Sequence, residues 1–326
     1  MATEMTGRLQ FGVLGPLEVW RDGEPVRLGG ERQRALLALL LVQANELVRV
    51  ETLVQELFGE RQSVGAVHAV QVAVSRLRAL LEKCDEHPVL ETRPGGYVLS
   101  IAPEQLDAAQ FERMLSDGRG LLAAGDAVSA AARLRAALGC WRGSPLADIT
   151  GVELVQSEIR RLEELRMLAV MERIDADLAV SDGDQLIADL EPLIAADPLQ
   201  ERLRGQLMLA LYRVGRQTDA LAVYPEVSGL LRDELGLEPG RALKELERSI
   251  LQQDPALDPV AGVSATATVG YLPAGDRVPG ARAGAGRAHR IAVQGRYTVV
   301  DADRGGRERE DPPRAAGRAR VRAGLP

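Results

Sequence analysis

Residues 66–83 read AVHAVQVAVSRLRALLEK, and this stretch decides how the N-terminal part of the chain is interpreted. Apolar side chains recur in it at steps of three and four residues, the spacing that places them on one face of an α-helix: Val67, Val70, Val74, Leu77 and Leu81. The polar and basic side chains fall largely off this face: His68, Gln71, Ser75, Arg76 and Arg78. The sequence therefore predicts an amphipathic helix with arginine on its exposed side.

Two shorter helices precede this segment, and a hairpin follows it. ERQRALLALLLVQ (31–43) is filled with leucine after a charged first turn, and ETLVQELFG (51–59) is a short helix closed by Gly59. PVLETRPGGYVLSI (88–101) predicts two strands joined by a tight turn, with Arg93 at the tip. Helix, helix, longer helix and basic-tipped hairpin is the order of a winged helix-turn-helix.

Short strands are expected ahead of these helices. Apolar residues alternate in RLQFGVLG (8–15) and PLEVWRDG (16–23), and EPVRL (24–28) follows the hairpin signal Asp22-Gly23. A further short strand, VRV (48–50), lies between the first two helices. A small sheet and a winged helix domain are therefore predicted for residues 1–102.

The sequence from about Asp107 to Asp254 has helical periodicity throughout. Breaks that contain glycine or proline divide it into about six or seven helices. Residues 207–240 have the length and the small/large pattern of a tetratricopeptide repeat, within which Pro225 should kink the second helix or shift its start. The predicted fold class is mainly α with a small β component: a winged helix-turn-helix domain, followed by an all-α, TPR-like helical repeat domain at 103–257.

Composition excludes several classes of protein. The net charge of −7 argues against a protein that coats nucleic acid by bulk electrostatics, so any DNA contact must be local. No apolar run approaches the roughly 18 to 20 residues of a membrane span, and no signal peptide opens the chain, so we expect a cytoplasmic protein that makes no membrane contact. Cys84 and Cys140 lie too far apart in sequence to suggest a disulfide or a zinc site. Because no catalytic or nucleotide-binding motif is present in the frame as written, we expect no enzyme, no cofactor and no metal.

Several motifs, taken in order, resemble the streptomycete antibiotic regulatory protein family over about residues 8–257. They are FGVLGPLEVW (11–20), GGERQRALLALLL (29–41), VQVAVSRLRALLE (70–82), TRPGGYVL (92–99), LRAALGCWRGSPLAD (134–148) and LMLALYRVGRQTDAL (207–221). The resemblance implies an OmpR-type winged helix followed by a bacterial transcriptional activation domain. It further implies an activator of a secondary-metabolite (antibiotic) gene cluster, bound to direct repeats near the promoter as a homodimer or oligomer. RNA polymerase, through its sigma and alpha subunits, is the protein partner that the resemblance implies.

The segment Val70 to Arg78 matches the recognition-helix motif of the OmpR type. The match implies that Arg76 reaches a base edge, with guanine as the natural partner, and that Arg78 meets a phosphate. The wing residue Arg93 matches the arginine that enters the minor groove in this type. The remaining candidates for DNA contact occupy exposed or N-terminal positions of the helix: His68, Gln71, Val72 and Ser75. The sequence departs from the type at Ala73 and Ser75, where basic residues are common.

Other interpretations stay open at this point. Each candidate arginine could be an ordinary solvated surface residue, and Arg32 and Arg34 could meet phosphate or simply flank Glu31. The helical repeats could make the protein an adaptor for another protein, and the same DNA contacts could serve a repressor.

The last segment, 258–326, changes composition. From Ala261 onward it holds 11 of the 33 glycines and 12 arginines against six acidic residues, so disorder is expected. Larger members of the family continue into an ATPase module, and residues 302–318 can be encoded by codons that, read one base later, give LTGAGGSGKTRLALQV, a full phosphate-binding motif. A frameshift near residues 272–278 is therefore a hypothesis. The alternative is an ordinary tail that adds nonspecific DNA affinity.

Overall fold

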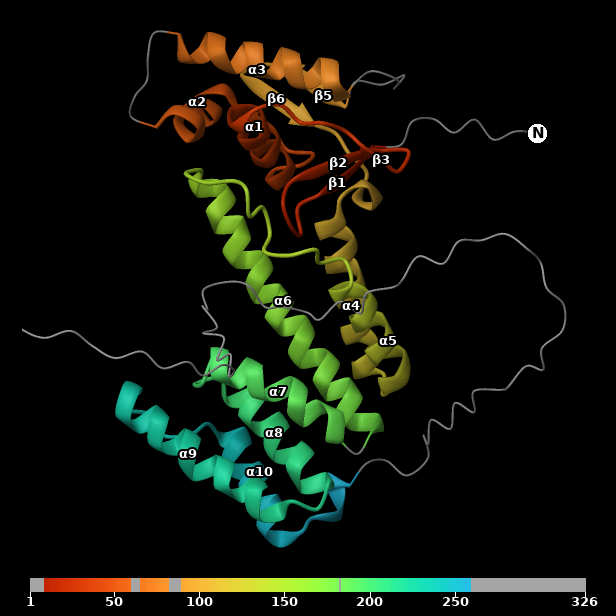
Figure 1. Ribbon diagram of the computed structural model, residues 1–326, viewed down its shortest axis with the longest axis vertical. Coiled ribbons are helices and arrows are strands. Elements are labelled where there is room, and N and C mark those ends of the chain that lie inside the picture. Colours follow the sequence, from red (N-terminus) through yellow and green to blue (C-terminus); the bar gives the residue numbers. More distant parts are fainter. Residues whose placement is uncertain (1–8, 60–64, 82–88, 182, 259–326) are drawn as a thin grey trace, which may run out of the picture. The chain divides into compact units, whose positions relative to one another are not determined.

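The N-terminal part of the chain folds around helix α1 (Glu31–Val42). A computed structural model describes residues 9–59, 65–81, 89–181 and 183–258 (Figure 1). Every residue of α1 from Ala35 to Leu41 is buried, because other elements pack on several sides of this helix. That burial explains why α1 has leucine where a surface helix would carry a polar stripe.

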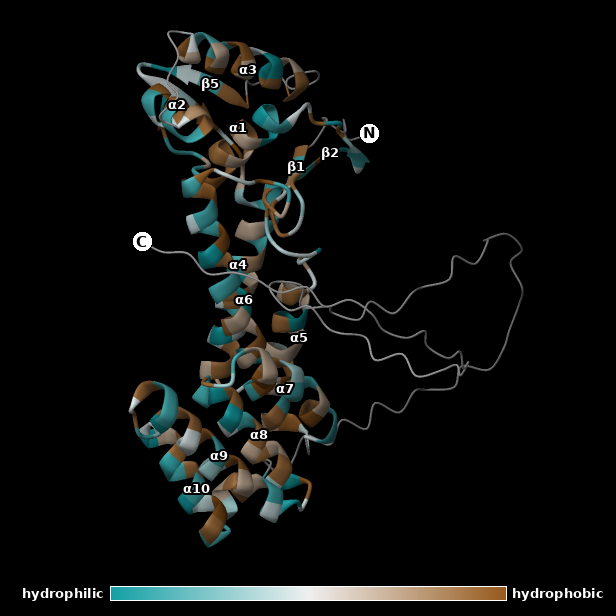
Figure 2. Ribbon diagram, turned by 60° about the vertical axis from the view of Figure 1, so that its left-hand side comes forward, coloured by the Kyte–Doolittle hydropathy of each residue, from teal (hydrophilic) through white to brown (hydrophobic). Residues whose placement is uncertain are grey.

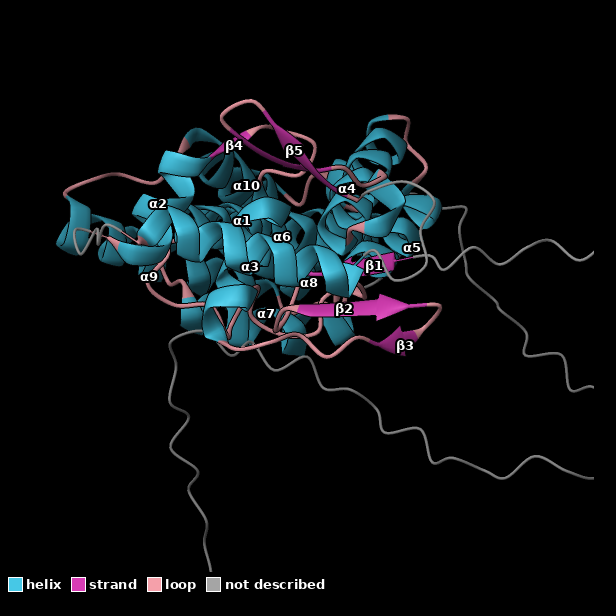
Figure 3. Cartoon of the chain, turned by 90° about the horizontal axis from the view of Figure 1, so that it is seen from above, coloured by secondary structure: helices cyan, strands magenta, loops and turns pink. Residues whose placement is uncertain are grey.

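Two small antiparallel sheets flank this helix (Figure 3). The first has the order β1-β2-β3, and the second has the order β4-β6-β5. Asp22 and Gly23 both have positive φ, 52° and 83°, the conformation of a two-residue type I′ hairpin turn, so the predicted hairpin is confirmed. The strands are β1 (Leu9–Gly12), β2 (Glu18–Arg21), β3 (Glu24–Pro25), β4 (Val48–Arg49), β5 (Leu90–Arg93) and β6 (Gly96–Leu99).

Helices α2 (Val50–Phe58) and α3 (Ala66–Leu81) complete the winged helix-turn-helix. Gly59 ends α2 with a φ of 58°, as the sequence predicted for a glycine C-cap. Helix α3 packs against both α1 and α2, and the β5–β6 hairpin forms the wing. The predicted fold class is confirmed; the last two residues of the predicted recognition helix lie outside the described residues.

The second part of the described chain is helical, and its helices follow one another in packed pairs (Figure 2). Glycines with positive φ stand at the breaks, among them Gly125 and Gly215. Pro225 lies inside α9, which begins eight residues before it, so the expectation that proline shifts the start of this helix is wrong. The helices are α4 (Asp107–Ala123), α5 (Ala127–Leu138), α6 (Glu153–Val180), α7 (Asp184–Ala196), α8 (Glu201–Arg213), α9 (Gln217–Leu235) and α10 (Arg241–Gln252).

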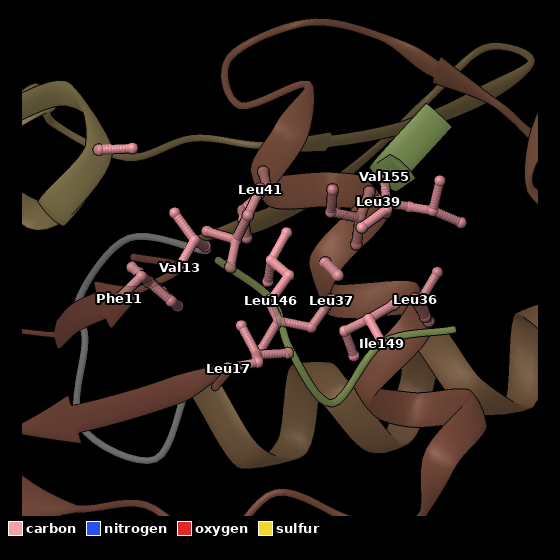
Figure 4. Packing of buried hydrophobic residues seen from close by; sticks show 14 of the residues in the cluster. Phe11, Val13, Leu17, Leu36, Leu37, Leu39, Leu41, Leu146, Ile149 and Val155 are labelled. Atoms are coloured by element: carbon pink, nitrogen blue, oxygen red, sulfur yellow. The ribbon is translucent and has the colours of Figure 1, made fainter. Parts of the chain in front are cut away.

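Helix α6 belongs to two hydrophobic cores. Its first half, through Ala169, packs in the same cluster as β1 and α1, whereas Met171 begins a separate cluster with α7 and α8. The segment between α5 and α6 adds Leu146 and Ile149 to the first cluster, where they lie beside Leu17 and Leu37 (Figure 4). The core of the winged helix domain is thus completed by residues that follow the predicted boundary at 102/103 in sequence.

Candidate DNA-binding surface

Helix α3 presents a polar face opposite its buried one. Ala66, Val70, Val74, Leu77 and Leu81 are buried, whereas the predicted contact residues His68, Gln71, Ser75 and Arg76 are exposed and Val72 is half-buried. The sequence placed Val67 on the buried face, but its side chain is 49% exposed. Ala66 takes that place instead. Ala66 precedes Val70 by four residues and lies about 40° from it around the helix, whereas Val67 precedes it by three residues and lies about 60° away on the other side.

Arg76 is the basic side chain best placed on this face. Within the described part of the chain it makes no hydrogen bond or ion pair, and α3 itself holds no acidic residue. A guanidinium that no carboxylate neutralises keeps its donors for a ligand. Arg76 therefore offers a fork of donors with no partner among the described residues, on the same face as Val72 and Ser75.

The wing turn has the geometry that its sequence predicted. Arg93-Pro94-Gly95-Gly96 closes the β5–β6 hairpin, with proline at the second position and Gly95 at a φ of 83°, as a type II turn requires. The Arg93 side chain is 59% exposed and pairs with Glu91 at 2.5 Å. An exposed pair of this kind contributes little free energy, so Arg93 can exchange it for another anion.

A further arginine lies beside Arg93 that the sequence did not single out. Arg49 in β4 and Arg93 in β5 are both in register with Gly96 in β6, and residues in register point to the same face of a sheet. Arg49 is exposed, and β4 approaches so closely that a Cβ on Gly96 would lie 2.2 Å from the Val48 carbonyl oxygen. The pairing of β4 with the wing, which sequence periodicity does not reveal, is what brings Arg49 here.

Arg78 has partners within the protein. Its Nε and Nη2 donate to the Leu90 carbonyl at 3.0 and 2.9 Å, and Nη2 also donates to Thr92 Oγ1 at 2.9 Å. This differs from the expected phosphate contact. The physical reason is that Arg78 lies on the side of α3 that faces β5, about 160° around the helix from Arg76.

Arg32 and Arg34 are also engaged. Arg34 Nε donates to Asp148 Oδ2 at 2.6 Å, its Nη2 donates to the Leu17 carbonyl at 2.8 Å, and its side chain is only 27% exposed. The guanidinium of Arg32 lies 5.3 Å from the centre of the Phe58 ring. The structure thus gives Arg34 partners within the fold, where this side chain joins α1 to the segment between α5 and α6.

A second group of charges lies at the junction, the region where the N-terminal part of the chain meets the segments that precede α4 and α6. Asp107 accepts from the Val13 and Leu14 amides at 2.8 and 3.1 Å, and Arg142 bonds to both Asp107 and Glu18. Burial raises the pKa of the Asp107 carboxyl, although its hydrogen bonds act in the opposite direction. These charges are satisfied within the fold and leave none for DNA.

A helix-turn-helix with a wing, an exposed helix face carrying arginine and an attached helical domain together define a winged-helix DNA-binding transcription regulator. Two family models match the chain: "transcriptional regulatory protein, C terminal" at residues 23–99 and "bacterial transcriptional activator domain" at 106–251. Regulatory protein DnrI of Streptomyces peucetius is 34% identical over 77% of this chain and 94% of its own length. The chain belongs to the streptomycete antibiotic regulatory protein family, whose members regulate transcription.

Other relatives differ in length. Regulatory protein AfsR of Streptomyces coelicolor is 42% identical over 83% of this chain, which spans only about a quarter of that relative (27%). The solved structure of Mycobacterium tuberculosis EmbR, in complex with a low-affinity phosphopeptide, is 38% identical and superposes with a TM-score of 0.73, over 76% of this chain and 66% of EmbR. Among the described helices, none combines the length and the apolar character that crossing a bilayer demands.

Proposed function

We propose that the protein is a sequence-specific activator that binds direct repeats near the promoter of a secondary-metabolite (antibiotic) gene cluster and recruits RNA polymerase. The observation that carries the DNA-reading part is the exposed face of α3 with Arg76 unneutralised beside it. The order of the two domains, a DNA-reading N-terminal head (residues 1–102) followed by an activator domain, supports promoter binding and the recruitment of RNA polymerase. We place the first domain at 1–102, the helical domain at 103–257 and the site of action at the nucleoid in the cytoplasm.

Each side chain of the α3 face has a role suited to its chemistry. Arg76 donates two hydrogen bonds to O6 and N7 of a guanine, and Val72, one turn earlier, packs on a thymine methyl group. His68, Gln71 and Ser75 line the same face and supply polar contacts to bases or phosphates. Helix α3 therefore lies in the major groove.

The wing supplies the second set of contacts. Arg93 leaves Glu91 and enters the minor groove, where a narrow groove concentrates negative potential. Arg49, on the same face of the wing sheet, meets the adjoining phosphate. Together the two arginines fix the protein across the backbone between the two grooves.

The charge of the head limits its affinity. Residues 1–102 hold 11 lysines and arginines against 13 acidic residues, and Arg34 is already bonded inside the fold. With few free charges, one copy releases few counterions and binds weakly. We therefore propose that at least two copies, a homodimer or a higher oligomer, bind repeated half-sites. The helical domain would contact the sigma and alpha subunits of RNA polymerase.

A binding experiment tests the DNA-reading part. The full chain is used to select duplexes from a randomised pool, and the affinity for the selected duplex is compared between the wild type, Arg76→Ala and Arg93→Ala. Loss of Arg76 should weaken binding by about 1–3 kcal/mol and relax the preference at one base pair. The matched control is Arg248→Ala, an exposed arginine of α10, which should bind as the wild type does. Unchanged affinity in both head variants would contradict DNA reading through this helix and wing.

A transcription assay separates the activator from its two rivals. A template carrying two copies of the selected site upstream of a promoter should give more transcript when the protein is added. Less transcript from the same template would identify a repressor. Absence of any selected sequence would favour an adaptor whose helical repeats bind another protein.

The tail at 258–326 is a separate proposal, and residues 259–326 lie outside the described residues. Residues 302–318 can be encoded by codons that give a complete phosphate-binding motif one base later, and this possibility supports a frameshift that removed an ATP-binding module. The nucleotide sequence of the gene tests it, because a continuous reading of that module in the alternate frame is required.

A further inference from the structure

Two arginines connect helix α3 to other elements of the N-terminal domain. Arg78, on α3 itself, bonds to the Leu90 carbonyl and the Thr92 hydroxyl of β5, the first strand of the wing. Arg21, at the end of β2, donates from Nη2 to the Leu80 and Leu81 carbonyls at 3.0 and 2.9 Å. Helix α3 is therefore tied to the wing at one point and to the N-terminal sheet at another.

The bonds from Arg21 hold the last described turn of α3 from a distant part of the chain. A positive charge near the C-terminal part of a helix interacts favourably with the helix dipole. Nε of Arg21 is buried and has no hydrogen-bond partner in the described part of the chain, and the residue as a whole is half-buried. A side chain placed at this cost is suited to holding this turn of α3 against the N-terminal sheet.

The bonds from Arg78 use the fork geometry of the guanidinium. Two nitrogen atoms meet one carbonyl oxygen while one of them also meets a hydroxyl, which a lysine ammonium cannot reproduce from the same position. The strand that receives these bonds also carries Arg93, one residue after Thr92. The contacts of Arg78 thus connect α3 directly to the strand that carries Arg93.

We propose that Arg78 and Arg21 are positioning residues that make α3 and the wing a single reading unit, and that Arg78 does not itself contact DNA phosphate. The inference rests on the proposed DNA-binding function. It assigns the wing contact of Arg93 to the Arg78 bonds, and the orientation of Arg76 to the Arg21 bonds.

The charge-preserving variant Arg78→Lys gives the sharpest test. The full chain and the duplex selected with the wild type are used, and affinity is measured over a series of salt concentrations. If Arg78 positions the wing, Arg78→Lys should lose about as much affinity as Arg78→Gln, roughly five- to tenfold, because both lose the fork geometry. If Arg78→Lys binds as the wild type does while Arg78→Gln does not, a simple charge contact with phosphate is responsible and the proposal is overturned.

A double variant removes the remaining ambiguity. The salt slope is the steepness with which the logarithm of affinity falls as the logarithm of salt concentration rises. Where Arg93 is already alanine, adding Arg78→Gln should change affinity by less than about twofold and leave this slope unaltered, because the wing contact is already lost. A direct phosphate contact would instead lower the slope by about 0.9 and weaken binding further in this background. Such a result would contradict positioning by Arg78 while leaving DNA binding itself intact.

Hydrogen exchange of the free protein tests the bracing without DNA. Arg78→Gln should speed exchange of the wing amides in β5 and β6, and Arg21→Lys should speed exchange at the last turn of α3, with the amides of α8 as an internal reference. Unchanged exchange in both segments would overturn the proposal even if Arg76 and Arg93 bind DNA as expected. If the wing exchanges faster but Arg93→Ala binds as the wild type does, the proposed wing contact with DNA fails while the bracing stands.

Discussion

Arginine has opposite roles on the two sides of the N-terminal head. On the side of α3 and the wing, Arg76 and Arg49 are exposed without a partner among the described residues, and Arg93 has one exposed pair. At the junction with the helical domain, Arg34 and Arg142 are 27% and 29% exposed and bond to carboxylates and backbone carbonyls. The number of arginines in the head therefore overstates the charge that is free to meet DNA.

The two sides also differ in what a lost arginine costs the fold. An exposed pair contributes about 0 to 1 kcal/mol, because solvent screens it and both side chains lose freedom. A half-buried arginine that donates to a carboxylate and a carbonyl takes a donor from both when it is removed, which costs more. We expect substitutions of arginines on the side of α3 and the wing (the reading side) to weaken DNA binding without changing stability. Substitutions at the junction with the helical domain should lower stability without changing the salt dependence of binding.

The largest effect is expected at Leu146, which comes from the segment before α6 but is fully buried in the core of the head. Leu146→Ala should lower the free energy of unfolding by about 2–5 kcal/mol, through lost burial and the cavity left behind. The backbone φ of 47° affects leucine and alanine alike, so the difference reports the side chain. Urea denaturation followed by circular dichroism measures it.

The control for this variant is Leu251→Ala, since Leu251 is 60% exposed at the end of α10. Its free energy of unfolding should stay within about 0.5 kcal/mol of the wild type. If Leu146→Ala is equally mild, the helical domain does not complete the core of the head, and the comparison between the two sides is drawn at the wrong boundary.

A smaller effect is expected for Arg34→Ala. Removing this guanidinium leaves Asp148 Oδ2 and the Leu17 carbonyl without this donor, while Asp148 Oδ1 keeps the Leu17 amide, so the free energy of unfolding should fall by about 1–3 kcal/mol. The folded variant should bind the selected duplex with the salt slope of the wild type. A slope lowered by about 0.9 would mean that Arg34 meets a phosphate after all, contrary to its position in the structure.

Much of the fold was predictable because it is encoded locally. Periodicity fixed the face of α3, and the residues of the two hairpin turns required positive φ at Gly23 and Gly95, which the structure has. Val67 was predicted on the buried face, but Ala66 lies there instead, and this difference shows the limit of prediction from periodicity. At the first turn of a helix, apolar residues lie at adjacent positions, and only packing decides between them.

The candidate site was less predictable, because it depends on contacts between distant segments. Arg78 and Arg76 are two residues apart and look alike in the sequence, yet one bonds to β5 and the other remains exposed. Arg49 gains its place only through the register of β4 with Gly96, and Arg34 gains its partner from Asp148, 114 residues later. No local pattern contains that information.

The smallest effect is expected at Arg49, and it sharpens the comparison most. Arg49→Gln should weaken binding to the selected duplex a few-fold and lower the salt slope by about 0.9, the value for one phosphate contact. Base preference should not change, because a phosphate carries no sequence information. Arg248→Gln on α10 removes the same charge outside the head and should leave the slope unaltered. Equal slopes for the two variants would show that Arg49 senses only the general field of the DNA, and the free arginines of the reading side would then reduce to Arg76 and Arg93.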